Sequence, residues 1–132
     1  MTIKTSWVPK KIWFAAALGW TVFVTVLCLV SFSDLPSVNV SGVDKYVHAT
    51  FHFVFVVLWF NYLRVEGRQN KTVLHAVILS LAYGILIEIA QGLFTATRQA
   101  DPKDVAANTA GAIIAAILLF SYNTYTKAGA RN

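Results

Sequence analysis

The stretch DKYVHATFHFVFVVLWFNYL, residues 44–63, joins a polar segment directly to an apolar one. Residues 44–52 hold an aspartate, a lysine and two histidines, and residues 53–63 are apolar enough to lie in a bilayer. A helix that crosses the hydrocarbon core needs about 20 predominantly apolar residues. The stretch therefore predicts a membrane-spanning helix. Its polar start requires a reason, because ionisable groups in a membrane cost free energy.

The whole chain is poor in polar residues. Of its 132 residues, 57% are hydrophobic and 13% are charged, whereas soluble domains carry about 25% charged residues. The formal net charge is +5. The basic residues lie between apolar segments, which favours a role in membrane orientation over binding of nucleic acid. The single cysteine, Cys28, lies within an apolar run and is interpreted as a small buried hydrophobic residue.

Four apolar runs are long enough to cross a membrane, at about residues 12–32, 46–63, 73–94 and 105–122. Lipid offers no hydrogen bonds to an open backbone, so each run is predicted to be a helix. The first run is longer than the apolar region of a secretory signal, which has roughly 7–15 residues, and it has no small-residue cleavage site at its end, so it is predicted to be retained. The predicted fold is all-α, a four-transmembrane-helix bundle in one domain, residues 1–132.

The basic residues also predict the orientation. Eight of the eleven lie on one side of the predicted spans, and Lys45, Arg98 and Lys103 lie on the other. Cytoplasmic loops carry the excess of Lys and Arg, so both termini are expected in the cytoplasm of a bacterial inner membrane. The start of the second span, the end of the third and the start of the fourth then face outward.

Polar residues from three predicted helices converge on this outer side. Asp44, His48 and His52 are spaced i, i+4, i+8, and Glu88 and Gln91 are three apart, so each set shares one helix face. Ionisable residues within spans usually face the bundle interior and mark function. The pattern predicts an outward-facing cavity lined by His48, His52, Glu88, Gln91, Arg98, Asp104 and Asn108.

Several of these residues also have structural explanations. Asp104 is a good N-cap for the fourth helix, and one residue can be both cap and site. Pro102 is expected to shape the preceding loop, and Lys45 can reach the headgroups. His52 is interpreted as a buried residue with a satisfied hydrogen bond. Interhelical hydrogen bonds or close small-residue packing are alternative roles for Gln91, Asn108, Gly84, Gly111, Ala112 and Ala115.

In order along the chain, the motifs DKYVH (44–48), EIAQ (88–91), Arg98 and DVAANTAG (104–111) resemble those of VanZ-like membrane proteins. The resemblance covers about residues 34–122. It implies that the family pattern falls on Asp44, Lys45, His48, Glu88, Gln91, Arg98, Asp104, Asn108 and Gly111. The family takes its name from a protein linked to low-level resistance to teicoplanin, a glycopeptide that acts at the cell wall, so a link to glycopeptide resistance is an expectation.

The leading hypothesis is that the cavity binds or modifies an anionic cell-envelope ligand, lipid-linked or derived from the wall. Lys45 and Arg98 would hold its phosphate or carboxylate. His48 and Glu88 are the candidate acid–base pair if a reaction occurs. The remaining ligand-binding candidates are Asp44, Gln91, Asp104 and Asn108.

Other functions fit the pattern less well or make different predictions. A structural or partner-binding module would use the polar residues only to hold the helices together. His48, His52 and Glu88 are acceptable metal ligands by type, but their spacing is a weak signal, so neither a metal nor a cofactor is predicted. Four helices are few for a transporter without oligomerisation, and a homo-oligomer is compatible with the sequence.

Overall fold

A computed structural model describes residues 8–30, 42–95 and 100–131. In these ranges the chain forms helices and turns and no strand. All four predicted spans are confirmed as helices that are long and apolar enough to cross a membrane. Their bounds are α1 (Lys10–Leu29), α2 (Val43–Leu63), α3 (Gln69–Phe94) and α4 (Pro102–Gly129).

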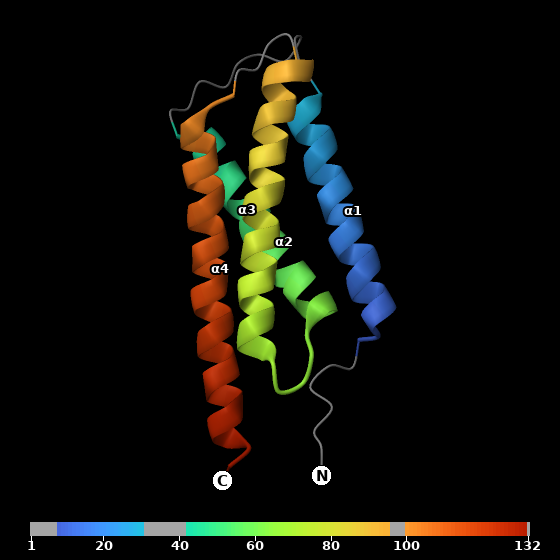
Figure 1. The fold of residues 1–132 in the computed structure, drawn as a ribbon, viewed down its shortest axis with the longest axis vertical. Coiled ribbons are helices and arrows are strands. Elements are labelled where there is room, and N and C mark those ends of the chain that lie inside the picture. The colour runs from blue at the N-terminus through green and yellow to red at the C-terminus, as the bar shows by residue number, and fades with distance from the viewer. Residues whose placement is uncertain (1–7, 31–41, 96–99, 132) are drawn as a thin grey trace.

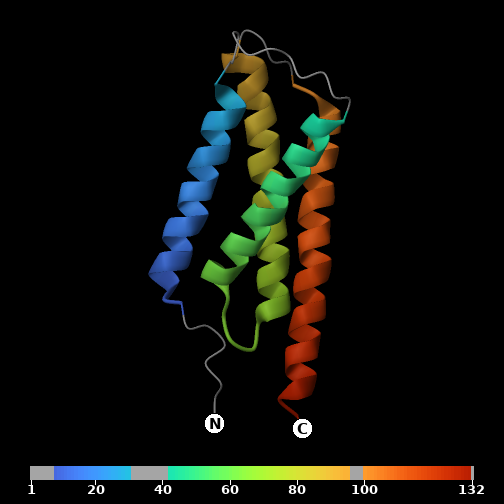
Figure 2. The same cartoon turned by 180° about the vertical axis from the view of Figure 1, so that it is seen from behind.

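The helices run alternately up and down, so that α2 and α4 begin at the end where α1 and α3 finish (Figure 1). We call this the polar end. The start of α1, the turn between α2 and α3, and the end of α4 lie at the opposite end (Figures 1 and 2). Helix α2 packs against each of the other three helices. The start of α2 lies against α4 (Figure 2).

The outer surface of the bundle is apolar. Large side chains that are more than half exposed include Val22 on α1, Leu86 on α3 and Ile117 on α4. Exposure of so much apolar surface to water would cost free energy, whereas contact with hydrocarbon lipid would not. The polar residues point inward or gather at the helix ends, as expected for a multi-pass membrane protein.

Helices α2 and α4 approach closely because α4 presents a glycine to the backbone of α2. A Cβ atom built on Gly111 would lie 1.9 Å from the carbonyl oxygen of Ala49, which is too close for two atoms that are not bonded to each other. Ala112 and Ala115, next to it on α4, are fully buried. Small residues let membrane helices approach closely. The expected packing role of these residues is therefore seen, and it sets the distance between the two helices that carry most of the polar end.

Polar side chains attach α1 to its neighbours. The indole Nε1–H of Trp20 donates to the carbonyl oxygen of Phe51 on α2 at 3.0 Å, and the Tyr83 hydroxyl of α3 donates to the carbonyl oxygen of Thr21 at 3.1 Å. Such bonds add direction to packing that lipid does not drive by the hydrophobic effect.

The helix ends differ from the predicted spans. Helices α2, α3 and α4 begin three or four residues before the predicted spans, and α4 continues past residue 122. Apolar runs locate the part of a helix in hydrocarbon, but the backbone stays helical through polar flanks. Helix α1 ends at Leu29, before the predicted end at residue 32, and residues 31–41 lie outside the described ranges.

The prediction that Asp104 caps α4 was wrong. The N-cap is Asp101, whose Oδ1 accepts a hydrogen bond from the backbone N–H of Lys103 at 2.9 Å, and Pro102 is the first helical residue. Proline suits that position because its missing N–H would have had no intrahelical partner. Asp104 lies in the first turn, where its side chain is free to face α2.

Candidate functional site

The polar end brings together seven polar residues from α2, α3 and the start of α4. We call the set the polar cluster, and it consists of Asp44, Lys45 and His48 of α2, Glu88 of α3, and Asp101, Asp104 and Asn108 at the start of α4. The cluster contains six of the residues that the sequence analysis proposed for the site, together with Asp101, which it did not.

Lys45 connects α2 to the start of α4. Its Nζ donates to Asp101 Oδ2 at 2.8 Å and also bonds Asp104 Oδ1. Asp44 Oδ2 lies 3.8 Å from the same ammonium group. The Lys45 side chain is 34% exposed. Three carboxylates thus surround one partly exposed cation, which a lysine that merely reached for lipid headgroups would not show.

The ion pair changes the acidity of Asp101. The Lys45 ammonium holds the pKa of the Asp101 carboxyl below its ordinary value of 3.8, and the hydrogen bond from the Lys103 N–H adds to the effect. Both interactions favour the ionised form of the carboxyl group. Asp101 is therefore a carboxylate across the physiological pH range.

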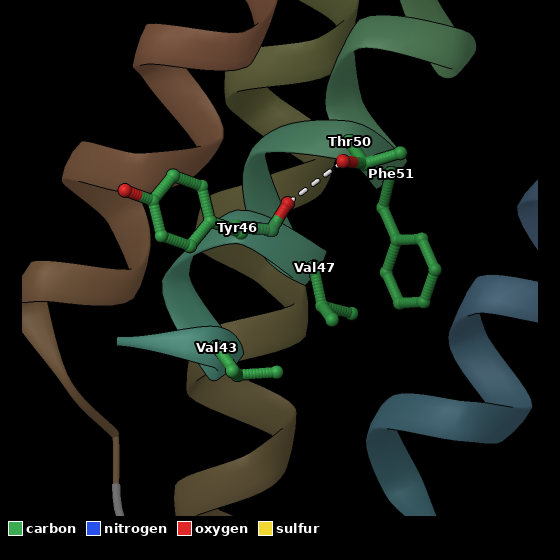
Figure 3. A pocket seen from close by; sticks show the side chains of 5 residues that line it. All are labelled: Val43, Tyr46, Val47, Thr50 and Phe51. Atoms are coloured by element: carbon green, nitrogen blue, oxygen red, sulfur yellow. Dashed lines mark hydrogen bonds between the residues drawn. The ribbon is translucent and has the colours of Figure 1, made fainter. Parts of the chain in front are cut away.

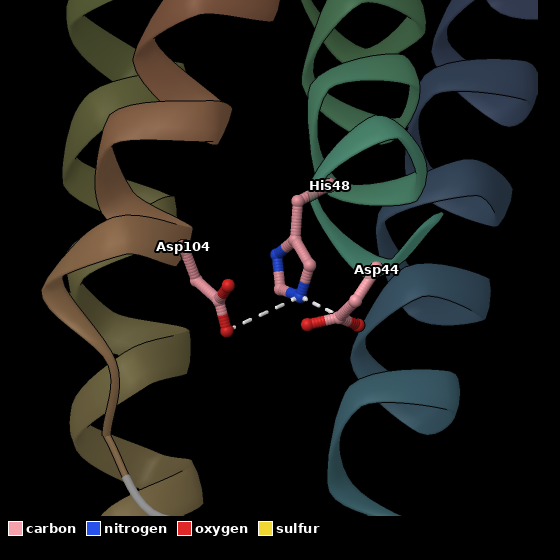
Figure 4. Close-up of side chains that lie close together, drawn as sticks. All are labelled: Asp44, His48 and Asp104. Carbon is pink, nitrogen blue, oxygen red and sulfur yellow. Dashed lines mark ion pairs between the residues drawn. The ribbon is translucent and has the colours of Figure 1, made fainter. Parts of the chain in front are cut away.

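His48 points between two carboxylates. Its side chain is 5% exposed, and Nε2 lies 3.6 Å from Asp104 Oδ2 and 3.8 Å from Asp44 Oδ1 (Figure 4). The other ring nitrogen, Nδ1, lies 3.1 Å from Asn108 Oδ1. A carbonyl oxygen only accepts hydrogen bonds, so Nδ1 carries the hydrogen and Nε2 of a neutral ring presents its lone pair to the carboxylates.

Glu88 is the deepest acid of the cluster and is 4% exposed. Its Oε2 accepts a hydrogen bond from the backbone N–H of Asp101 at 3.0 Å, which links α3 to the cap of α4. Its Oε1 is buried and has no hydrogen-bond partner among the described residues. The Nδ2 of Asn108 is in the same condition. Buried polar atoms are nearly always paired, so these two atoms need an explanation.

Two other predicted cavity residues lie outside the cluster. The side-chain amide of Gln91 donates to the carbonyl oxygen of Cys28 at 2.9 Å and so connects α3 to α1. His52 Nδ1 lies 2.7 Å from Ser80 Oγ, one helical turn below His48. The structural interpretation of His52 is thus supported by its contacts. Arg98 lies outside the described residues.

The described cluster is acidic. When the three aspartates of the cluster are ionised, their three negative charges exceed the one positive charge of Lys45 by two. Lys103, just beyond the cluster, is exposed. The cluster as a whole therefore attracts cations, and an anion approaching Lys45 must compete with the aspartates that already surround it.

A surface hollow lies on a different face of α2. It is lined by Val43, Tyr46, Val47, Thr50 and Phe51 (Figure 3). The Thr50 hydroxyl donates to the Tyr46 carbonyl oxygen of its own helix at 2.8 Å. Apart from the hydroxyl groups of Tyr46 and Thr50 these side chains are apolar, and none of them belongs to the polar cluster. The hollow therefore suits lipid contact rather than the predicted polar chemistry.

Asp101 is the site residue that the sequence reasoning missed. The signal was present in the sequence DPKD, residues 101–104, because an Asp followed by Pro is typical of an N-cap and first helical position. With Asp101 assigned as the N-cap, Asp104 falls in the first turn of α4, and both carboxylates lie at the end of α4 that meets Lys45.

No curated protein and no solved structure matches the chain significantly. The family model described as VanZ/LLP1 matches residues 4–123, a range that includes every residue of the polar cluster. With four helices able to span a membrane and a match over most of its length, the chain belongs to the VanZ/LLP1 family.

Proposed function

We propose that this VanZ/LLP1-family protein binds an anionic cell-envelope ligand at its polar cluster, on the outward side of a bacterial cytoplasmic membrane. The ligand is lipid-linked or derived from a wall precursor. The distribution of Lys and Arg supports the outward orientation, since the polar end holds the minority of the basic residues.

The observation that carries the proposal is the position of Lys45. Its ammonium is partly exposed at the polar end of the bundle, where aspartates hold it. Asp101 is 40% exposed and Asp104 is 10% exposed, so Asp101 is the partner that an incoming group replaces more readily. A ligand phosphate or carboxylate would take the place of Asp101 at Lys45, while Asp104 keeps the lysine in position.

Two buried atoms supply further contacts to such a ligand. Glu88 Oε1 is an acceptor without a donor, and Asn108 Nδ2 is a donor without an acceptor, among the described residues. Envelope precursors that carry sugars offer hydroxyl groups, which can donate a hydrogen bond to Glu88 Oε1 and accept one from Asn108 Nδ2. A ligand that satisfies both atoms gains affinity, because an unmet buried polar group costs about 1–3 kcal/mol.

The second candidate function is a structural module. It is favoured by the interhelical bonds of the cluster, such as His48 to Asn108 and Lys45 to Asp101, which alone would hold α2 against α4. Under this alternative, every substitution in the cluster lowers stability and none changes ligand content.

Catalysis by His48 and Glu88 stays a prediction. His48 contacts Asn108 and two aspartates, and Glu88 contacts the Asp101 backbone, so the described structure does not pair the two side chains with each other. The proposed link to glycopeptide resistance is supported by family membership alone.

The test is identification of the lipids and wall precursors that copurify with the full chain, by mass spectrometry. Lys45→Met removes the proposed anion contact, and Lys103→Met is the matched control because it removes an exposed lysine nearby. We expect an anionic envelope lipid or precursor with the wild type and the control, and its loss from a folded Lys45→Met variant. The same ligand content in all three proteins would refute the proposal.

A further inference from the structure

Each of two aspartates in the polar cluster divides its oxygens between two partners. Asp104 turns Oδ1 to Lys45 and Oδ2 to His48. Asp44 turns Oδ2 to Lys45 and Oδ1 to His48. The two oxygens that face His48 and the Nε2 atom of its ring all lie within 4.8 Å of one another. The imidazole ring of His48 thus lies between the carboxylates of Asp44 and Asp104, close to both (Figure 4).

The contacts between the ring and the two carboxylates are too long for hydrogen bonds. Nε2 lies 3.6 Å and 3.8 Å from the two oxygens, whereas an N–H···O bond spans about 2.7–3.2 Å. Oxygen and nitrogen ligands of a tetrahedral zinc ion, bound at about 2.0–2.2 Å, are about 3.4 Å apart. The two distances from Nε2 exceed this value by only about 0.2 and 0.4 Å, so a metal ion would draw both carboxylates slightly toward the ring. Asp44, with a side chain 58% exposed, is free to make this movement.

His48 is prepared for this role by its other nitrogen. Metal-binding histidines usually donate their second ring N–H to an oxygen that fixes the ring. His48 Nδ1 is hydrogen-bonded to Asn108 Oδ1, which leaves the Nε2 lone pair directed at the two carboxylates. A lone pair that faces two anions is repelled, and either a proton on Nε2 or a metal ion between the three atoms removes that repulsion.

The charge of the three aspartates and Lys45 suits a divalent ion. Asp44, Asp101 and Asp104 carry three negative charges against the one positive charge of Lys45, which leaves two. Glu88, buried nearby, has an oxygen that lacks a partner among the described residues. It can accept a hydrogen bond from a metal-bound water. This is a second, independent sign that a polar species belongs here.

We propose that Asp44, His48 and Asp104 bind a divalent metal ion of the zinc class at the polar end. The set differs from His48, His52 and Glu88, which the sequence offered as ligand types, because His52 is bonded to Ser80 and lies on the far side of His48. Three protein ligands leave at least one coordination position for water or an anionic group. Metal binding does not depend on the identity of the envelope ligand.

The test is a Zn²⁺ titration of the full chain in detergent after treatment with a chelator. Calorimetry gives the affinity, and elemental analysis after desalting gives the bound metal. Asp44→Asn removes one ligand at an exposed position, so it should fold. His48→Asn keeps a donor for Asn108 but lacks Nε2. His75→Gln is the control, because this exposed histidine lies on α3 at the opposite end.

We expect one equivalent of Zn²⁺ in the wild type and in His75→Gln, and at least tenfold weaker binding in folded Asp44→Asn and His48→Asn. Absence of saturable binding in the wild type, or equal affinity in all four proteins, would overturn the metal site. A wild-type protein that binds Zn²⁺ but copurifies with no anionic envelope ligand would count against the proposed function alone.

Discussion

Lys45 Nζ lies 2.8 Å from Asp101 Oδ2, although 56 positions of sequence separate the two residues. The contact joins the start of α2 to the N-cap of α4. The same carboxylate side chain caps α4 through the Lys103 N–H, so one residue both begins a helix and holds a cation beside it. Opening this pair is the step by which an anion would reach Lys45.

The Lys45–Asp101 pair should persist to low pH. The folded pKa of Asp101 is below its ordinary value of 3.8, so the pair contributes stability above that pH and loses it as the pH falls through the folded pKa. The melting temperature difference between the wild type and Asp101→Asn should be constant between about pH 5 and 7 and shrink below about pH 3.8. A difference that disappears already near pH 6 would show that another group controls the pair.

Gly111→Ala should destabilise the bundle strongly for so small a change. The added methyl group would overlap the Ala49 carbonyl oxygen, so α2 and α4 must separate. Overpacking of this kind costs about 1–3 kcal/mol. Gly19→Ala is the matched control, because a Cβ atom there meets nothing within 4 Å. Thermal unfolding in detergent compares them, and equal melting temperatures would contradict the close approach.

Gln91→Leu should lower stability without removing the bound ligand. The substitution deletes the hydrogen bond to the Cys28 carbonyl oxygen, a loss of about 1–3 kcal/mol if that oxygen stays buried. Thr50→Ala, which deletes an exposed bond within one helix, is the control. Melting temperature and copurified ligand are measured together. A Gln91→Leu protein that is as stable as the wild type but lacks the ligand would show that Gln91 belongs to the binding site.

Glu88→Gln should have the opposite outcome. Glutamine retains an oxygen that accepts from the Asp101 N–H, so the link between α3 and α4 survives. The NH₂ group then stands where Oε1 was. A ligand would meet a hydrogen-bond donor in place of an acceptor. We expect a melting temperature close to that of the wild type and loss of the copurified ligand. A marked fall in melting temperature would favour the structural module.

The sequence predicted the helices better than it predicted the site. Long apolar runs identify spans directly, and the spacing of Asp44 and His48 correctly placed both on one face of α2. Spacing alone does not say what that face meets. His52 shares the face by periodicity, yet at its depth the neighbour is Ser80 of α3 rather than α4.

The position of Lys45 shows the same limit from another side. Its reach toward lipid headgroups and its pairing with acids are equally compatible with its place in the sequence. The choice depends on how closely α2 and α4 approach, which Gly111 decides, and on Asp101 being the cap that turns Asp104 toward α2. Both are tertiary facts, so the carboxylates around Lys45 emerged only from the structure.

The central claim, that Lys45 is a binding group rather than only a structural tie, is tested most directly by quantifying the copurified anionic ligand in Asp101→Asn and Lys45→Met by mass spectrometry. Asp101→Asn removes the competing carboxylate from Lys45, so the account predicts more ligand per protein than in the wild type, whereas Lys45→Met should lose it. If neither variant changes the ligand content and both melt at lower temperature, Lys45 only holds α2 against α4, and the binding proposal is wrong.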